Sequence, residues 1–550
     1  MRKRLGISLV VALFALMAVL SGCSSDDGGN GGKESGAAEG SGEKPKVLNL
    51  TVYNPIFSKS PLGTQVQEKW QEMMEEYLGV KLDITWEEAP FGDYNEKMPT
   101  YIAGGDFADV FGIADIGKVH DLGDSGQLLN LKDYMDQMPN YKKYLDSDPY
   151  GEKKVASTEG GIYGFVDGSE GNHNGTQAVF GVRFDILQKH DLKPPTTFDE
   201  MFTVAKKLKE LYPDSYPLTN VYGGTAIIDH LLTMNHSGTG VFFNGEKFVY
   251  GPLADDGRFK GVIEYLHKFY AEGLLDPEYA INTGEQSIAK MLSGKNFITP
   301  FVYGLDLKEK LNNNAEHPEV VWGLIPHPKN LQGEVSWKIG SQKEGKVLSS
   351  WYSTVISAKT KNPELVVKML DYQFSDEMVE LANWGIEGVT FTKEGDKKTF
   401  KPEILQAASA MQELAKYGVN MSMSVRSGIQ FIPQQKEAEI PLTQTVPAYV
   451  DGEYMDRNYW LYTDEANGKE SISPGDSVNM PPLVFTEDEK LEMSSILTPM
   501  ATFVEESITK FIAGKMPMDQ WDKFVSDLKA MGDIDTVLKL YNDRYQEVKK

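Results

Sequence analysis

Cysteine is almost absent from this sequence, since Cys23 is the only one in 550 residues. A single cysteine excludes a disulfide within the chain, so packing alone must stabilise the fold. The eight histidines are scattered, and neither His-Glu-x-x-His nor Cys-x-x-Cys occurs. The nucleophile elbow Gly-x-Ser-x-Gly and the phosphate loop ending in Gly-Lys-Ser/Thr are also missing. The sequence therefore gives no positive support to catalysis, a metal site or a cofactor.

Positive charge is also scarce, because 55 basic residues face 80 acidic ones, a net charge of −25. A chain this acidic repels nucleic acid and anionic lipid, and it has no basic block to overcome that repulsion. Nucleic acid is therefore excluded as a partner. Attachment to a membrane would need an anchor other than surface charge.

The amino-terminal residues are typical of an export signal. Arg2, Lys3 and Arg4 precede an apolar run over residues 5–20, which is short for a membrane span. The following Leu20-Ser21-Gly22-Cys23 resembles the lipobox of bacterial lipoproteins. The resemblance implies removal of residues 1–22 and a diacylglycerol on the Cys23 sulfur. The alternative is an ordinary cleaved signal followed by a free thiol, which would be an oxidation liability outside the cell.

A tether is predicted after Cys23, because residues 24–46 are rich in glycine, serine, lysine and glutamate and have no periodicity. Such a segment buries too little apolar surface to offset the cost of ordering. By random-coil scaling it reaches on the order of 25 Å. We therefore assign residues 23–46 to a lipidated cysteine and a disordered tether.

An α/β fold is indicated where periodicity begins. An alternating strand at 47–52 is followed by a helix at 65–77 and a second strand at 80–86. Strand, helix and strand in this order form the parallel crossover unit of α/β domains. Amphipathic helices are expected at 259–270 and 490–512 as well. The length favours two or more lobes over a single domain.

Five stretches together resemble a known family. They are Gly104–Val110, Ile162–Gly164, Gly273–Pro277, Ser357–Glu364 and Asn383–Gly388. In order and spacing they are similar to motifs of extracellular solute-binding proteins of family 1, the maltose-binding type. The last stretch resembles the Gly-x-Glu-Gly segment of the long lipoprotein LplA-like subgroup.

The resemblance implies a two-lobed periplasmic-binding-protein-like fold of the class II type, with a hinge and a ligand cleft between the lobes. By analogy, the first lobe combines residues 47–165 with 299–361. The second combines residues 166–298 with 362–550. Closure of two lobes about a hinge is a known way to bury a ligand.

Candidate ligand residues are aromatic or hydrogen-bonding groups expected near strand ends and loops, because sugars present apolar C–H faces and a rim of hydroxyls. They are Asn54, Asp109, Tyr303, Trp351, Tyr352, Trp384, Glu387, Arg426 and Trp460. Core packing is an equal alternative for Trp351 and Tyr352, and capping of a local turn for Asp109. A surface or lobe-packing role is an equal alternative for Arg426 and Trp460.

We therefore predict a monomeric, lipid-anchored solute-binding protein of an ABC importer on the extracellular face of a Gram-positive cell membrane. Its partners would be a carbohydrate, specifically an oligosaccharide, and membrane permease subunits, with no cofactor. A peptide or another solute is an alternative ligand. A secreted carbohydrate-active enzyme is a further alternative, which would need two carboxyl groups about 5–10 Å apart across a cleft.

Overall fold

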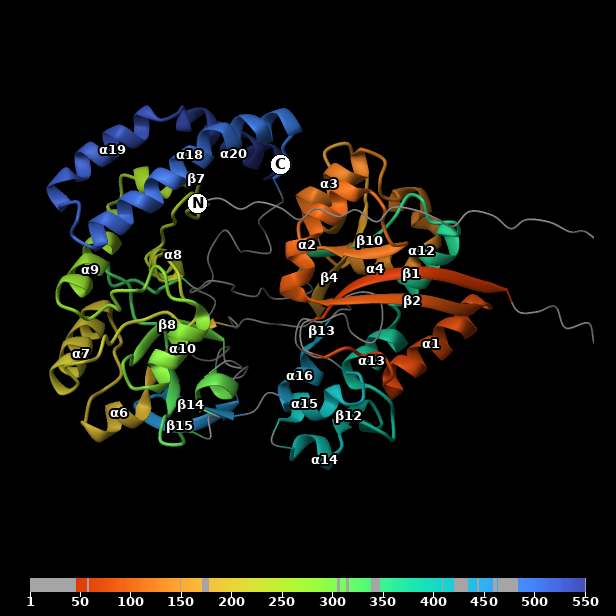
Figure 1. The fold of residues 1–550 in the computed structure, drawn as a ribbon, viewed down its shortest axis with the longest axis horizontal. Coiled ribbons are helices and arrows are strands. Elements are labelled where there is room, and N and C mark those ends of the chain that lie inside the picture. The colour runs from red at the N-terminus through yellow and green to blue at the C-terminus, as the bar shows by residue number, and fades with distance from the viewer. Residues whose placement is uncertain are drawn as a thin grey trace, which may run out of the picture. The chain divides into compact units, whose positions relative to one another are not determined.

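The computed structural model describes residues 46–549 apart from 57–58, 149, 171–177, 304–306, 313–315, 338–346, 408, 420–433, 443–444, 459–461 and 463–482. Residues 46–550 form one compact unit, and its secondary structure is labelled in Figure 1. The predicted export signal, Cys23 and the tether lie outside the described residues.

The first sheet is mixed and has the strand order β13-β4-β10-β3-β1-β2. Its strands are β1 (Val47–Ile56), β2 (Lys81–Pro90), β3 (Val110–Ile113), β4 (Gly164–Glu170), β10 (Val347–Ile356) and β13 (Gln434–Gln435). β1 pairs in parallel with both β2 and β3, whereas β10 runs antiparallel to β3 and β4. A strand from the middle of the chain therefore lies inside a sheet begun at the amino terminus.

The predicted strand-helix-strand unit at the start of the fold is confirmed. In β1, Leu48, Leu50 and Val52 are buried and alternate with exposed neighbours, which is the period-two pattern of a half-buried strand. α1 (Gln65–Leu78) begins where the Thr64 hydroxyl accepts a hydrogen bond from the Gln67 N–H. It ends at Gly79, whose φ of 66° is a left-handed conformation that suits glycine.

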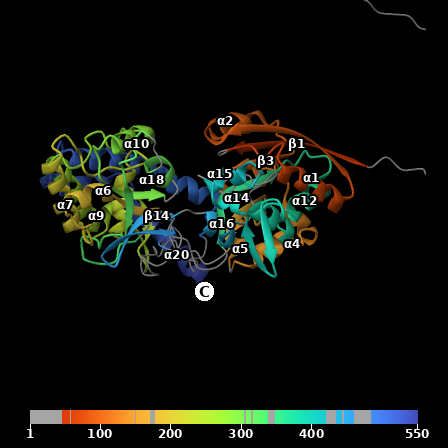
Figure 2. The same ribbon diagram turned by 90° about the horizontal axis from the view of Figure 1, so that it is seen from below.

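Helices from two distant parts of the chain cover the first sheet. The earlier group is α1, α2 (Phe91–Gly104), α3 (Ile116–Asp124), α4 (Pro139–Asp146) and α5 (Gly151–Val155). The later group is α12 (Pro363–Tyr372), α13 (Asp376–Trp384), α14 (Pro402–Leu405), α15 (Ala410–Ala415) and α16 (Lys436–Leu442), with the hairpin β11 (Phe391–Glu394) and β12 (Lys397–Phe400). Figure 2 shows α12, α14 and α15 in teal among α1, β1 and β3.

The second sheet has the order β15-β14-β9-β5-β8. Its strands are β5 (Ala178–Arg183), β8 (Ile298–Tyr303), β9 (Trp322–Ile325), β14 (Thr445–Val450) and β15 (Glu453–Asn458). β5 runs antiparallel to both β8 and β9, so these two strands point the same way and finish at the same end of the sheet. β14 lies parallel to β9.

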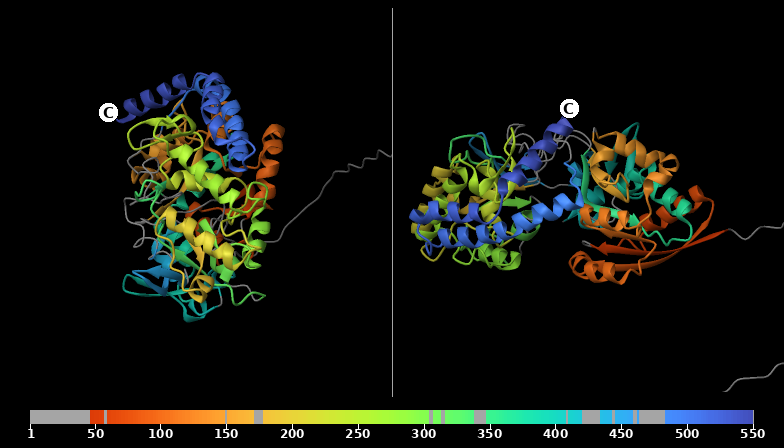
Figure 3. Two further views of the ribbon diagram at one scale, coloured as in Figure 1. Left: turned by 90° about the vertical axis from the view of Figure 1, so that its left-hand side faces the viewer. Right: turned by 90° about the horizontal axis from the view of Figure 1, so that it is seen from above.

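Helices of the middle and the end of the chain pack around the second sheet. They are α6 (Phe184–Lys189), α7 (Phe198–Leu211), α8 (Ala226–Met234), α9 (Arg258–Ala271), α10 (Gly284–Leu292), α18 (Glu487–Ile512), α19 (Trp521–Ala530) and α20 (Ile534–Lys549), with the hairpin β6 (Val241–Phe243) and β7 (Phe248–Tyr250). α18 packs along α9, and Figure 1 shows the blue α18 beside the green α9. Figure 3 shows the blue carboxyl-terminal helices from two further sides. Its start is fixed by a reciprocal capping box of Thr486 and Glu489.

The division of the chain between the two sheets differs from the expectation. Residues 299–361 were assigned to the first lobe, but β8 and β9 pair in the second sheet and only β10 joins the first. Residues 362–550 were assigned to the second lobe, but α12 packs on the first core. There the Trp70 indole N–H of α1 donates to Gln373, at a distance of 3.0 Å. Strand pairing over long sequence separations decides this division, and local patterns do not encode it.

Among the residues that the structure describes, no helix is both long enough and apolar enough to cross a bilayer. The longest, α18, is amphipathic in its burial: Val504, Ile508 and Phe511 are buried in the second core, while Glu505 and Glu506 are exposed or nearly so. Its length therefore serves packing within this fold.

Asp371 should be a strong stability determinant of the first lobe. Its fully buried carboxylate accepts hydrogen bonds from the Tyr141 N–H at 2.7 Å and from the Asn140 amide at 2.8 Å, which joins α12 to α4. We expect Asp371→Ala to lower the free energy of unfolding by about 2–3 kcal/mol, because it leaves a buried N–H without its partner. Urea unfolding would measure this. Asp146→Ala, at an exposed surface ion pair with Lys142, is the matched control and should change it by less than about 0.5 kcal/mol; equal effects would contradict the assignment.

Candidate functional site

The carboxyl end of the first sheet, where β1, β2 and β3 finish, is the place at which α/β sheets present ligand-binding loops. Asn54 lies at this end, on the buried face of β1, and is only 3% exposed. β10 runs the other way, so its first residues lie at the same end of the sheet. A polar side chain from β1 and the start of β10 are therefore brought to one end of the sheet.

Trp351 lies in the irregular part of β10. Along β4, Ser349 pairs with Asp167 but Ser353 pairs with the adjacent Val166, so the register shifts between these two serines. Ser353 also pairs with Ile113, the last residue of β3. The backbone thus places Trp351 just beyond the end of β3, at the carboxyl end of the sheet. Bulges of this kind often lie next to binding sites, where they redirect a side chain.

The neighbouring Tyr352 has the packing of a core residue. It is 1% exposed, and its phenol lies so close to Gly112 of β3 that a Cβ there would fall 1.5 Å from the hydroxyl oxygen. Gly112 is required by this close approach between strands. The position favours the core role that the sequence left open for Tyr352.

Asp109 ties two strands together. Its carboxylate accepts hydrogen bonds from both the N–H and the hydroxyl of Thr51 on β1, each at 2.9 Å. It immediately precedes β3, so it lies at the amino end of that parallel strand, opposite the end at which ligands commonly bind. This position favours the local structural role over ligand contact.

Trp384 and Glu387, the two remaining predicted ligand residues of the first lobe, lie in different surroundings. Trp384 is 2% exposed, its indole stacks on Phe400 at 4.6 Å, and its N–H donates to Gln435 at 3.1 Å. Glu387 lies in the loop after α13 and is exposed. The Trp384 contacts favour a core role, whereas Glu387 is accessible to solvent.

The carboxyl end of the second sheet carries an aromatic group. Tyr303 is the last residue of β8, opposite Ala178. Two residues earlier, Phe301 stacks on the His230 ring of α8, with the ring centres 4.0 Å apart and the planes at 17°. Tyr222 meets Phe301 edge-on at 5.6 Å. β8 therefore delivers aromatic rings to the end of the sheet at which β9 also finishes.

His230 is held as a neutral ring. It is 8% exposed, and its Nδ1 is buried without a hydrogen-bond partner. Burial lowers its pKa to about 4. At neutral pH this side chain contributes an uncharged aromatic ring to the packing of α8 on β8.

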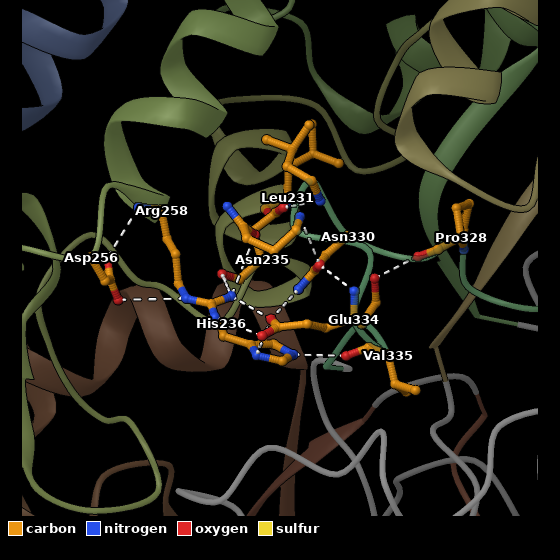
Figure 4. Close-up of polar contacts among 12 residues, drawn as sticks. Leu231, Asn235, His236, Asp256, Arg258, Pro328, Asn330, Glu334 and Val335 are labelled. Atoms are coloured by element: carbon orange, nitrogen blue, oxygen red, sulfur yellow. Dashed lines mark hydrogen bonds and ion pairs between the residues drawn. The ribbon is translucent and has the colours of Figure 1, made fainter.

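A second aromatic group, which sequence reasoning missed, is formed by a loop after β9. Trp337 stacks on His236, which directly follows α8, with the ring centres 4.0 Å apart and the planes at 16°. Figure 4 shows His236 beside the loop that contains Asn330 and Glu334, with Arg258 of α9 reaching the same carboxylate. The available signal was a turn-forming Asn-x-x-Gly sequence shortly before a tryptophan.

Arg426, Trp460 and Cys23 lie outside the described residues, and the side chains of Tyr303 and Trp351 are not described either. Within the described ranges, no group of three or more His, Cys, Asp or Glu side chains is arranged to hold a metal ion.

The sequence profile of the family described as bacterial extracellular solute-binding protein matches residues 61–380, which is more than half of the chain. This chain belongs to that family. The resemblance noted from its motifs is thereby confirmed at the family level. The family consists of binding components of transport systems, so this protein is a solute-binding protein and not an enzyme.

Similar proteins match over most of this chain. The fructooligosaccharide ABC transporter substrate-binding protein FusA of Streptococcus pneumoniae is 25% identical and matches 98% of this chain and 97% of its own. The polygalacturonan/rhamnogalacturonan-binding protein YtcQ of Bacillus subtilis is 22% identical over 72% of this chain and 75% of its own. The crystal structure of the alginate-binding protein AlgQ2 matches with a TM-score of 0.66 at 20% identity, covering 92% of this chain and 99% of that one. The predicted two-lobed fold class is confirmed.

The unusual state of His230 predicts a pH dependence of stability. Its pKa is about 4 in the folded protein, below its ordinary value of 6.5, so the unfolded chain takes up the proton first. Its contribution is therefore complete above pH 6.5 and is lost as the pH falls towards 4. Between pH 7.5 and 4.5, we expect wild type to lose about 2–3 kcal/mol more unfolding free energy than His230→Gln.

Urea unfolding at the two pH values measures this difference. His317→Gln is the matched control, because that ring is 38% exposed beside Glu319. The control should lose as much stability as wild type on acidification. An identical loss in wild type and His230→Gln would show that His230 is not held neutral.

Proposed function

We propose that this protein is the lipid-anchored, extracellular binding component of an ABC importer for an oligosaccharide. The observation that carries the proposal is the nearly full-length similarity to FusA, which is named for fructooligosaccharide binding. YtcQ and AlgQ2 are also named for binding carbohydrate polymers. These names support a carbohydrate over a peptide.

The arrangement of the strands supports a ligand site built from both sheets. β10 brings Trp351 to the carboxyl end of the first sheet, and β8 brings Tyr303 to that of the second. Aromatic planes at such positions suit the apolar faces of sugar rings, and Asn54, at the same end of the first sheet, and the exposed Glu387 remain hydrogen-bonding candidates. We retain Trp351 and Tyr303 as the leading ligand residues.

The lobes proposed to close on the ligand follow the sheets. The first combines residues 46–170 with 347–442, and the second combines 178–337 with 445–549. The chain then enters the second lobe after Glu170, returns to the first after Trp337 and enters the second again after Leu442. Three crossings are consistent with a hinge that permits closure while limiting twist.

Anchoring through Cys23 and docking on permease subunits complete the proposal. The lipobox-like Leu20-Ser21-Gly22-Cys23 supports the anchor. A relative, lipoprotein LipO of Bacillus subtilis, is 23% identical over 52% of this chain. The monomeric state, the Gram-positive source and the LplA-like subgroup are further predictions of this scheme.

A thermal-shift screen of the purified protein tests the ligand class. The panel should contain fructo-, galacturono- and malto-oligosaccharides together with mixed peptides. An oligosaccharide present at 100 times its dissociation constant should stabilise the folded state by about 2.7 kcal/mol. Stabilisation by peptides with no response to any saccharide would overturn the proposal.

Trp351 and Tyr352 are adjacent but should behave oppositely. For Trp351→Ala, we expect at least about tenfold weaker oligosaccharide binding by calorimetry with unchanged stability, because a stacking face is lost. For Tyr352→Ala, we expect a loss of about 3–5 kcal/mol of unfolding free energy, because the substitution opens a cavity in the first core. Unaltered affinity in a folded Trp351→Ala variant would remove this residue from the site.

A further inference from the structure

His236 occupies a backbone position that glycine usually fills. α8 ends in a Schellman motif, in which the His236 N–H donates to the Thr233 carbonyl and the Ser237 N–H to the Leu232 carbonyl. The left-handed residue of this motif is His236, with a φ of 59°. For a residue with a Cβ, that conformation costs on the order of 1 kcal/mol. The chain thus accepts local strain to place an imidazole here.

The His236 ring lies against two polar groups besides its stacking partner. Its Nε2 lies 2.7 Å from the Val335 carbonyl oxygen, and its Nδ1 lies 3.3 Å from a Glu334 carboxylate oxygen. The Val335 contact requires a proton on Nε2, so in the neutral ring Nδ1 carries no proton, and it pairs with the Glu334 carboxylate only when the imidazole is protonated. Both contacts come from the loop that ends at Trp337.

Arg258, the first residue of α9, holds that loop from the other side. Its guanidinium donates to both oxygens of Glu334, at 2.6 and 2.9 Å, in the two-pronged geometry that only arginine provides. Arg258 and the Asn330 amide lower the pKa of Glu334 to about 2. The carboxylate is therefore ionised throughout the physiological range.

The loop is also tied internally. The Asn330 side-chain oxygen accepts hydrogen bonds from the N–H groups of Gln332 and Glu334, at 3.0 and 2.9 Å. The Ser336 hydroxyl donates to the Pro328 carbonyl at 2.5 Å. Asn235, next to His236, accepts from the Leu331 N–H at 2.9 Å. Figure 4 shows these contacts converging on one short turn.

Trp337 lies at the end of this rigid loop. It is half-buried, with one ring face against His236. It follows β9, which finishes at the carboxyl end of the second sheet, and it is the last described residue before β10 of the first sheet. An aromatic plane is thus held where the chain leaves one sheet for the other, beside charged and amide groups suited to hydroxyls.

We infer that Trp337, stacked on His236, is a sugar-ring platform of the ligand site, and that Arg258 and Glu334 are the positioning residues that hold it. This inference rests on the proposed function. A tryptophan whose side chain is already ordered before the ligand arrives binds a sugar ring without the entropy cost of ordering that side chain. The class of ligand is an oligosaccharide with at least one ring exposing an apolar C–H face.

Calorimetry with tri- and tetrasaccharide fructans and oligogalacturonides tests the platform. For the saccharide that wild type binds most tightly, we expect Trp337→Ala to raise the dissociation constant at least about tenfold. Trp337→Phe should keep it within about threefold of wild type, because phenylalanine retains an aromatic face. Arg258→Lys should weaken binding about three- to tenfold by losing the two-pronged contact. Arg544→Lys alters an ion pair between Arg544 of α20 and Glu489 of α18; it is the matched control and should have no effect.

A second measurement needs no ligand. A protonated imidazole quenches the fluorescence of an indole stacked on it, so acidification should dim wild type more than His236→Gln. The same comparison made in a Trp337→Phe background should show no difference, which isolates Trp337 from the other tryptophans. If acidification dims wild type and His236→Gln equally, Trp337 is not stacked on His236 in solution.

The outcomes separate the two proposals. If wild type binds saccharide and a folded Trp337→Ala variant binds equally well, the platform is wrong and the proposed function stands. Equal losses in Trp337→Ala and Trp337→Phe would likewise refute stacking. If wild type binds no saccharide but binds peptide, the proposed function fails and the platform fails with it.

Discussion

The insertion of β10 between β3 and β4 is the constraint on which the first lobe depends. Its ten residues pair with strands that lie some 180 to 240 positions earlier in the chain. The helices after it must then return to the same sheet, as the contacts of Asp371 with α4 and of Gln373 with Trp70 confirm. The same strand carries Trp351 to the end of the sheet where ligands commonly bind. The pairing of β10 with β3 and β4 thus determines the first core, the path of the chain and the position of the candidate site.

Local structure was largely predictable, whereas the partition of the chain was not. The alternation in β1, the capping threonine of α1 and its terminal glycine are short-range signals, and each gave the observed element. Residues 299–361 supply strands to both sheets, which differs from the expected single lobe, because a strand's partner is chosen by long-range packing. Nothing within residues 298–303 distinguishes a strand of the second sheet from one of the first.

The candidate site shows a similar limit. Tyr352 and Trp384 had the right chemistry for a sugar, but an aromatic residue at an element's end serves a core equally well, and both are buried. Asp109 lies at the wrong end of its strand, which only the parallel pairing reveals. Trp337 was missed because its setting depends on His236 and Arg258, which are about 100 and 80 positions away. Sequence supplies the residue types, and topology selects among them.

The interleaved connectivity also governs the order in which the molecule can form. The first core needs residues up to Leu442, and the second needs Phe524 and Val537 near the carboxyl terminus. The first lobe can therefore be completed only after Leu442 has been synthesised, and the second only when synthesis is almost finished. Contacts of such large sequence separation make folding slow, because the entropy cost of closing long loops comes before the stabilising contacts form. A chain that stays open this long is well suited to passing through a membrane in extended form before it folds.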